Sequence, residues 1–373
     1  MKKATRIAAG LLLMLVSCND SKKETDKLTI ESAVMPATDP VIYSFVFTGC
    51  NRINGGDPSN ASTANVMALK SIFNDITALK NKPSLLFLLG DVVLGETNTT
   101  DLNNQLSAWV AQYKDTKFSN ISTSGIEVVA VPGNHEMLDA SEKPLSGSTD
   151  IWLKYMAPYM PSDRKQVAST ANLDNRMTFS FTRNNIAFIV MNTDSYNPPT
   201  TQNHHGLEGL VPTDSILKML NDFKANKAIE HIFVLGHKPY YVNGKSCTGH
   251  KGLPEGTVLW PAFNKAGVVA MLSAHEHDYQ RWQLPADTGT YQVIAGNAGS
   301  QGEAKFFGYS IMNILKSGKV QLISRGFTKQ KPYYTMPSPV IFTTRDSTIL
   351  TWSKNAKPYP NYTNTDDCNL KKK

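Results

Sequence analysis

Short apolar runs alternate with longer amphipathic stretches from about residue 41 onward. The uninterrupted runs predict strands over 41–48, 85–89, 126–131, 186–191, 231–235 and 268–272. Between them, apolar residues at helical spacing predict helices over 63–80, 102–113, 213–224 and about 257–264. Runs such as LLFLL at 85–89 are typical of strands that are buried on both faces of a sheet. The alternation predicts a layered α/β domain.

The pattern changes in the last part of the chain, where strands follow one another with fewer helices between. Residues 291–295, 309–315 and 319–324 predict strands of an antiparallel portion. We expect one domain over 40–330, preceded by a polar tether over 18–39. Residues 331–373 form a C-terminal extension that is polar toward its end, and we expect it to be partly flexible.

The N-terminus has a basic start followed by ten apolar residues, 7–16. This run is too short to span a bilayer as a helix, and it fits a secretory signal. It ends in Leu-Val-Ser-Cys, which resembles a bacterial lipoprotein signal over 1–17 with lipid on Cys18. A plain signal peptide cut elsewhere is the alternative. We therefore expect a protein of the bacterial cell envelope, periplasmic or at the cell surface, with the membrane as a partner through its lipid anchor.

The charge of the chain gives no argument for nucleic-acid binding. The net charge of +7 falls to +4 once 1–17 is removed, because that segment holds three basic residues and no acidic ones. No basic helix or arginine-rich run is present in the sequence. The sequence therefore does not indicate a nucleic-acid partner.

The chain has four cysteines, Cys18, Cys50, Cys247 and Cys368, and they cannot all form disulfides if one of them carries lipid. If Cys18 carries lipid, three remain in an oxidising compartment, and three cannot all pair within one chain. Cys247 and Cys368 could pair, which would leave Cys50 as the odd one. Cys50 follows a glycine at the end of the first predicted strand. It is a candidate metal ligand, with a disulfide partner or a small buried apolar residue as the alternatives.

Polar residues follow directly after four other predicted strands. These segments are Gly90-Asp91, Pro132-Gly133-Asn134-His135-Glu136, Gly236-His237 and Ala274-His275-Glu276-His277. In an open α/β sheet the strand ends on one side form the ligand crevice, so we expect the four segments to converge. Asp, Asn and His side chains are suitable ligands for a divalent or trivalent metal ion. His275 and His277 are two apart, which would place both imidazoles on one face of an extended segment.

Four ordered motifs within residues 89–281 resemble those of the calcineurin-like metallophosphoesterases. They are LGDVVLG, PGNHE, GHKPYY and SAHEHDYQR, and the last two are most similar to the purple acid phosphatase branch. The resemblance covers about 41–325. It implies a four-layered αββα sandwich of two mixed sheets flanked by helices. It also implies hydrolysis of a phosphomonoester or phosphodiester, a small-molecule substrate, with two metal ions, namely iron, zinc or manganese.

Carried over position by position, the resemblance implies a role for each motif residue. Asp91 would bridge the two metal ions, Asn134, His237 and His275 would complete the shell of one ion, and His277 would bind the other. A hydroxide held at the metals would attack phosphorus. His135 would act as general acid or stabilise the transition state.

Taken singly, these residues also have structural interpretations. Asp91 could be a turn residue, and His237 or His275 a core histidine. Glu136 and Glu276 are expected beside the ligands or in solvent, and not among the ligands.

The first motif departs from the family pattern. Gly49-Cys50-Asn51-Arg52 stands where family members have Asp-x-His or Gly-Asp-x-Gly, so the thiol of Cys50 takes the place of the first metal's carboxylate. A thiolate ligand would favour zinc or iron. Asn51 and Arg52 would hold phosphate oxygens, with a surface ion pair as the alternative for Arg52. Leu94 replaces the tyrosine of the purple branch, so we expect no purple colour.

Two further expectations concern a residue that contacts the substrate and the functional class of the protein. His204 and His205 lie in a long stretch without predicted helix or strand, and His205 is a candidate substrate contact, with a solvated loop as the alternative. The altered first motif also leaves a different function class open. In that class the protein is a catalytically inactive phosphoester-binding or scaffold lipoprotein.

Overall fold

A computed structural model describes most of the predicted domain. The described residues are 39–53, 60–141, 143–171, 173–196, 209–242, 252–284, 289–302 and 304–350. Several of the predictions lie outside them: the signal segment with Cys18, the tether up to residue 38, His205, and the pairing of Cys247 with Cys368.

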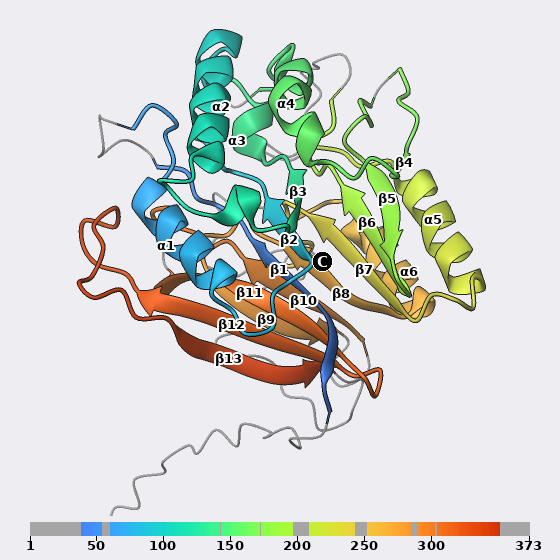
Figure 1. Ribbon diagram of the computed structural model, residues 1–373. Coiled ribbons are helices and arrows are strands. Elements are labelled where there is room, and N and C mark those ends of the chain that lie inside the picture. The colour runs from blue at the N-terminus through green and yellow to red at the C-terminus, as the bar shows by residue number, and fades with distance from the viewer. Residues whose placement is uncertain are drawn as a thin grey trace, which may run out of the picture. The chain divides into compact units, whose positions relative to one another are not determined.

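Two mixed sheets form the centre of the domain (Figure 1). The six-stranded sheet has the order β13 (Thr343–Leu350), β12 (Val320–Thr328), β11 (Phe306–Leu315), β1 (Val41–Thr48), β2 (Leu85–Leu89) and β3 (Glu127–Val131). The seven-stranded sheet has the order β4 (Lys165–Gln166), β5 (Phe179–Arg183), β6 (Ile186–Met191), β7 (His231–Gly236), β8 (Val268–Ser273), β10 (Thr290–Ala295) and β9 (Tyr279–Leu284).

Each sheet has a parallel part. β1, β2 and β3 are parallel, as are β6, β7, β8 and β10. The flanking strands β11, β12, β13, β4, β5 and β9 pair antiparallel. Because parallel strands end at the same edge of a sheet, the polar segments that follow them come together there.

Helices cover the outer face of each sheet. α1 (Val66–Thr77), α2 (Thr99–Lys114) and α4 (Ser148–Met156) pack on the six-stranded sheet, and α5 (Thr213–Ala225) and α6 (Gly256–Ala266) pack on the seven-stranded sheet. Short helices lie between them: α3 (Asn134–Met137), η1 (Ile121–Thr123) and η2 (Ala157–Tyr159). The side chains of Asn65 and Asn98 cap α1 and α2 by accepting from backbone N–H groups of the first turn.

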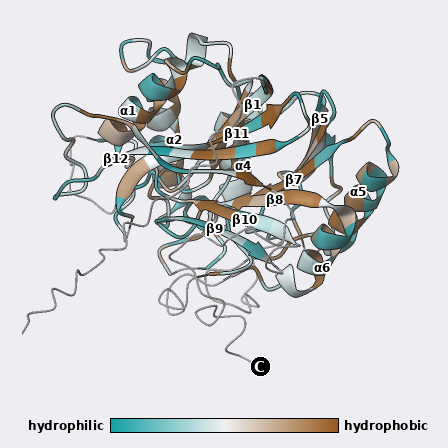
Figure 2. Ribbon diagram, turned by 90° about the horizontal axis from the view of Figure 1, so that it is seen from below, coloured by the Kyte–Doolittle hydropathy of each residue, from teal (hydrophilic) through white to brown (hydrophobic). Residues whose placement is uncertain are grey.

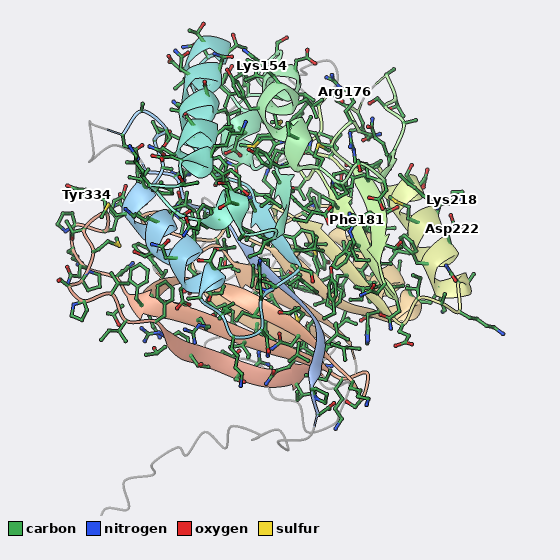
Figure 3. All side chains as sticks on the ribbon, viewed as in Figure 1. Lys154, Arg176, Phe181, Lys218, Asp222 and Tyr334 are labelled. Atoms are coloured by element: carbon green, nitrogen blue, oxygen red, sulfur yellow. The ribbon has the colours of Figure 1, made fainter. Side chains whose placement is uncertain are left out.

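One apolar core lies between the sheets, and others lie beneath the helices, because alternate residues of each strand point to opposite faces. Phe45 and Phe47 belong to the core between the sheets, whereas Val46 between them packs with the buried face of α1. The ring of Phe45 packs edge-on against Phe233 at a centroid distance of 5.1 Å. Figure 2 shows the strands β7 and β8 as largely hydrophobic, and Figure 3 labels Phe181 within the seven-stranded sheet.

The predicted fold is confirmed: two mixed sheets are packed face to face and flanked by helices. The hydrophobic pattern did not single out α4, β5, β9 or β13. β13 lies beyond residue 330 and pairs with β12 from Val320↔Leu350 to Gly326↔Thr343. Among the described residues, no helix has the length and apolar character needed to cross a bilayer.

Candidate metal centre

The predicted site residues lie in loops that directly follow parallel strands. Cys50 follows β1, Asp91 follows β2, Asn134 follows β3, His237 follows β7, and His275 follows β8. Both sheets contribute, and each of the five side chains is at most 1% exposed. The packing of the two sheets therefore brings together residues that are up to 225 positions apart in the chain.

Four ligand atoms form a small cage. Asn134 Oδ1 lies 3.0 Å from His237 Nε2 and 3.0 Å from His275 Nδ1. The two imidazole nitrogens are 3.2 Å apart, and Asp91 Oδ1 lies 3.2 Å from His237 Nε2. Donor atoms that surround a tetrahedral metal ion at about 2 Å lie roughly 3.3 Å from one another. These four separations are therefore compatible with a bound metal ion.

The ring of His237 is held so that Nε2 faces the cage. Its Nδ1 lies 2.7 Å from the carbonyl oxygen of Leu89 and donates to it, which leaves the lone pair of a neutral ring on Nε2. Burial lowers the pKa of His237, but the adjacent Asp91 carboxylate outweighs it and the pKa is raised.

The two oxygens of Asp91 have different neighbours. Oδ1 belongs to the cage, whereas Oδ2 lies 3.5 Å from Nε of Arg52 and 3.9 Å from Sγ of Cys50. Burial alone would raise the pKa of Asp91, but the positive charges of its neighbours, His237 first, hold it well below its usual range. Asp91 is therefore a carboxylate with both oxygens engaged.

Cys50 is a free, fully buried thiol next to the cage. Cys50, Asp91 and His237 offer ligand atoms that all lie within 4.8 Å of one another. The thiol sulfur accepts a hydrogen bond from the backbone N–H of His275 at 3.1 Å. Burial, and then the charge of Asp91, raise the pKa of Cys50 well above its usual value. Without a metal ion Cys50 is a neutral thiol, and a bound cation would deprotonate it.

Three of these residues have left-handed backbone conformations that non-glycine residues rarely adopt. The φ angles are 57° at Cys50, 54° at Asp91 and 67° at His275. Each such residue costs about 1–3 kcal/mol, and such conformations cluster at functional sites. The positive φ of His275 and the bends over 275–278 show that this segment is not the extended one that the sequence predicted.

Comparison with known proteins identifies the family. The family model of the calcineurin-like phosphoesterases matches residues 63–279, more than half of the chain. This chain belongs to the calcineurin-like phosphoesterase family. Members of this family typically bind two metal ions. A search of curated proteins finds no significant match.

Solved structures of calcineurin-like phosphoesterase fold are similar at low sequence identity. PhoD matches with a TM-score of 0.53 and 13% identity, over 88% of this chain and 73% of PhoD. GAP50, the anchor in the inner membrane complex of Plasmodium, matches with a TM-score of 0.51 and 15% identity, over 84% of this chain and 89% of GAP50. The purple acid phosphatase PPD1 of yellow lupin (Lupinus luteus) seeds matches with a TM-score of 0.49 and 14% identity, over 76% of this chain and 51% of PPD1. The likenesses to PhoD and GAP50 support the fold.

In this calcineurin-like phosphoesterase, Glu136 fastens two of the ligand loops together. It is fully buried, and its carboxylate accepts four backbone N–H groups, those of Gly133 (2.7 Å), Asp91 (3.1 Å), Val92 (2.8 Å) and Val93 (3.2 Å). Burial raises the pKa of Glu136 to about 7. Glu136 thus lies beside the ligands and out of solvent, where it fixes the backbone of Asp91.

His135 points away from the cage toward the loop after β2. Its Nδ1 lies 2.5 Å from the carbonyl oxygen of Leu94, and its Nε2 lies 3.2 Å from Oε1 of Glu96. Burial lowers the pKa of His135 to about 3, and the neighbouring carboxylate of Asp91 acts in the opposite direction. Because Nδ1 faces a carbonyl oxygen, it carries the proton of the neutral ring.

The remaining predicted site residues lie at the margin of the cage. Nδ1 of His277 lies 2.5 Å from the carbonyl oxygen of Gln301. The amide of Asn51 donates to the carbonyl oxygens of Ala298 at 2.8 Å and Asn65 at 3.3 Å, so it braces the loop around Cys50. Arg52 is 7% exposed and faces Asp91.

The sequence analysis missed a buried ion pair directly behind His237. Nζ of Lys238 lies 2.5 Å from Oδ1 of Asp194, and both side chains are fully buried. Asp194 follows the predicted strand 186–191 in the same way that the other motif residues follow theirs. The rule that found the four motifs would therefore have found Asp194 if it had been applied to this strand.

Proposed function

We propose that this protein hydrolyses a phosphomonoester or phosphodiester at a metal centre. The observation that carries the proposal is the cage of Asp91, Asn134, His237 and His275, whose neighbouring ligand atoms are 3.0–3.2 Å apart. A cation in this cage would polarise the phosphoryl oxygens and lower the pKa of water. Family membership supports the reaction class. The similarity of GHKPYY and SAHEHDYQR to the purple acid phosphatase branch supports iron, zinc or manganese as the metal.

The protein's own residues supply binding and proton transfer. Asp91, Asn134 and the two histidines hold the cation in a buried, preorganised geometry. His135 is the candidate general acid for the leaving oxygen, a role that requires its ring to turn from Leu94 and Glu96 toward the substrate. Arg52, which lies against Asp91, is a cationic side chain that could hold a phosphoryl oxygen at this centre.

The experiment is hydrolysis of an aryl phosphate and of a bis-aryl phosphodiester by the purified protein. Turnover should be lost after chelation and restored by added metal, and it should be lost in Asn134→Ala and in His135→Ala. Lys218→Ala on the exposed face of α5 is the control, because the ion pair of Lys218 with Asp222 is solvated and far from this chemistry (Figure 3). Undiminished turnover by the metal-free protein would refute the proposal.

The first motif favours a second candidate function. A thiol and a guanidinium replace the usual ligand types at Cys50 and Arg52, so the fold could bind a phosphoester without hydrolysing it. Tight phosphate binding without turnover on any of a panel of mono- and diesters would favour this scaffold function.

The location in the cell envelope is a separate proposal that rests on residues 1–18 alone. Lipid on Cys18 would tether the domain to the membrane. Mass spectrometry of the mature N-terminus tests it: a diacylated cysteine is expected, and an unmodified Cys18 would refute the anchor.

A further inference from the structure

Arg52 is held tightly against Asp91 by its backbone and its side chain. Its N–H donates to the carbonyl oxygen of Asp91 at 3.0 Å, and its own carbonyl oxygen accepts from the hydroxyl of Ser300 at 2.9 Å. Its Nε lies 3.5 Å from Oδ2 of Asp91, with the two side chains 9% and 1% exposed. The loop therefore fixes the backbone of Arg52, and its side chain lies beside Asp91 and is largely shielded from solvent.

The guanidinium lies on the side of Asp91 where a second cation would bind. A carboxylate that bridges two metal ions presents one oxygen to each. Here Oδ1 belongs to the cage with His237, and Oδ2 faces Arg52 and Cys50. A guanidinium keeps its charge at all physiological pH values, so Oδ2 is already neutralised by a permanent cation.

Cys50 and His277 are the other candidate ligands of a second ion, and the contact of Nδ1 of His277 with a carbonyl oxygen leaves its Nε2 for a cation. Cys50 Sγ accepts the N–H of His275 at 3.1 Å and lies 3.9 Å from Oδ2 of Asp91. Nδ1 of His277 faces the carbonyl oxygen of Gln301 at 2.5 Å. A second metal ion bound between these groups would share its site with the charge of Arg52, and the two cations would repel each other.

We propose that the guanidinium of Arg52 replaces the second cation of the centre, so that each chain binds a single metal ion. This inference rests on the proposed metal-dependent function. The retained ion is the one in the cage, where all four donor groups are buried. The positive charge that a second ion would contribute to a phosphoryl group is supplied by Arg52.

The test is the number of metal ions bound per chain after reconstitution with Zn²⁺ or Mn²⁺ and dialysis, measured by elemental analysis. We expect one equivalent in the wild type and in Arg52→Lys, which keeps the positive charge. We expect a second equivalent in the double variant Arg52→His with Cys50→Asp, which restores an imidazole and a carboxylate. With Mn²⁺, electron paramagnetic resonance should change from the six-line spectrum of an isolated ion to that of a spin-coupled pair.

Each outcome decides between the proposals. Two equivalents in the wild type would overturn the single-ion centre and leave the proposed function intact. One equivalent in both the wild type and the folded double variant would overturn the role of Arg52. No bound metal in the wild type would overturn the proposed function itself. If the double variant does not fold, Arg52→Gln, which is neutral and similar in size, must show a second Zn²⁺-binding step by calorimetry, and its absence counts against the proposal.

Discussion

At the scale of single residues, the centre is built by side chains that fix the backbone beside the ligands. Glu136 holds the N–H groups of Gly133 and of residues 91–93, and Asp91 keeps a left-handed φ of 54° within that clamp. The carboxylate offers two acceptor oxygens to four donors, a geometry that a neutral amide cannot reproduce.

Replacing Glu136 should weaken metal binding. In Glu136→Gln one oxygen becomes an NH₂ donor that faces backbone N–H groups, so we expect the metal affinity to fall by about 10- to 100-fold, as for other residues that orient ligands. Glu136→Asp keeps the charge with a shorter reach and should lose less. Competition with a chromophoric chelator measures the affinity, and equal affinities for Glu136→Gln and the wild type would contradict the clamp.

A second residue-scale prediction concerns pH. Burial raises the pKa of Asp174, but its hydrogen bonds with Arg176 outweigh this and the pKa is lowered (Figure 3 labels Arg176). Because the folded pKa lies below the unfolded value, this pair stabilises the fold above the ordinary pKa of aspartate. The stabilisation is lost as the pH falls through the folded value.

We therefore expect Asp174→Asn to be less stable than the wild type by about 1 kcal/mol near neutral pH. The difference should shrink as the pH falls below roughly 4. Urea unfolding at a series of pH values measures it. Asp222→Asn, in an exposed pair with Lys218, is the control and should change stability little at any pH. A difference for Asp174→Asn that grows toward acid would contradict this account.

At the scale of elements, the strand-to-loop junctions determine how closely the ligand loops approach. Gly133 ends the turn after β3 with a φ of −107°, which any residue can adopt. A Cβ at this position would clash with Oδ1 of Asp91 and would lie 2.6 Å from its backbone nitrogen. The glycine is therefore required by space and not by conformation.

Gly133→Ala should displace Asp91 from the cage. We expect most of the bound metal to be lost, as seen by elemental analysis, together with a fall in stability of about 1–3 kcal/mol from overpacking. Gly318→Ala is the control: its Cβ meets nothing within 4 Å, although its φ of 82° adds local strain. Full metal content in Gly133→Ala would show that the loops are free to shift.

At the scale of the whole domain, β13 links the two sheets. Asp346 on β13 accepts hydrogen bonds from Tyr279 Oη at 2.7 Å and from Arg281 Nε at 2.8 Å, and both donors lie on β9. β13 is at the edge of the six-stranded sheet and β9 at the edge of the seven-stranded sheet. This contact fastens one side of the sandwich.

Asp346→Ala should leave Arg281 buried without this carboxylate. We expect the free energy of unfolding to fall by about 3 kcal/mol, at the lower end of the range for breaking a buried ion pair, because the two side chains are 9% and 12% exposed. The metal content should not change, because the contact lies away from the cage. Urea denaturation with parallel metal analysis tests both expectations. Asp346→Asn, which keeps an acceptor for Tyr279, should lose less.

Much of the fold followed from local pattern. The strands 41–48, 85–89 and 186–191 have the predicted bounds, because each is a short, mostly apolar run with polar or turn residues on either side. β9 and β13 were missed because mixed polar and apolar residues give them no such run. Arg281 and Asp346 are polar within strands and are accommodated by pairing with each other.

For the candidate site too, some features follow from the sequence and others only from the tertiary structure. The sequence alone specified which residues follow strands and which of them can bind a metal ion, because residue type and position after a strand are local properties. The tertiary structure decided that Oδ2 of Asp91 faces Arg52, that Glu136 lies beneath the ligand loops, and that Lys238 pairs with Asp194. These contacts depend on how the two sheets pack and on loop backbones with positive φ. Neither feature produces a hydrophobic pattern that could be recognised in the sequence.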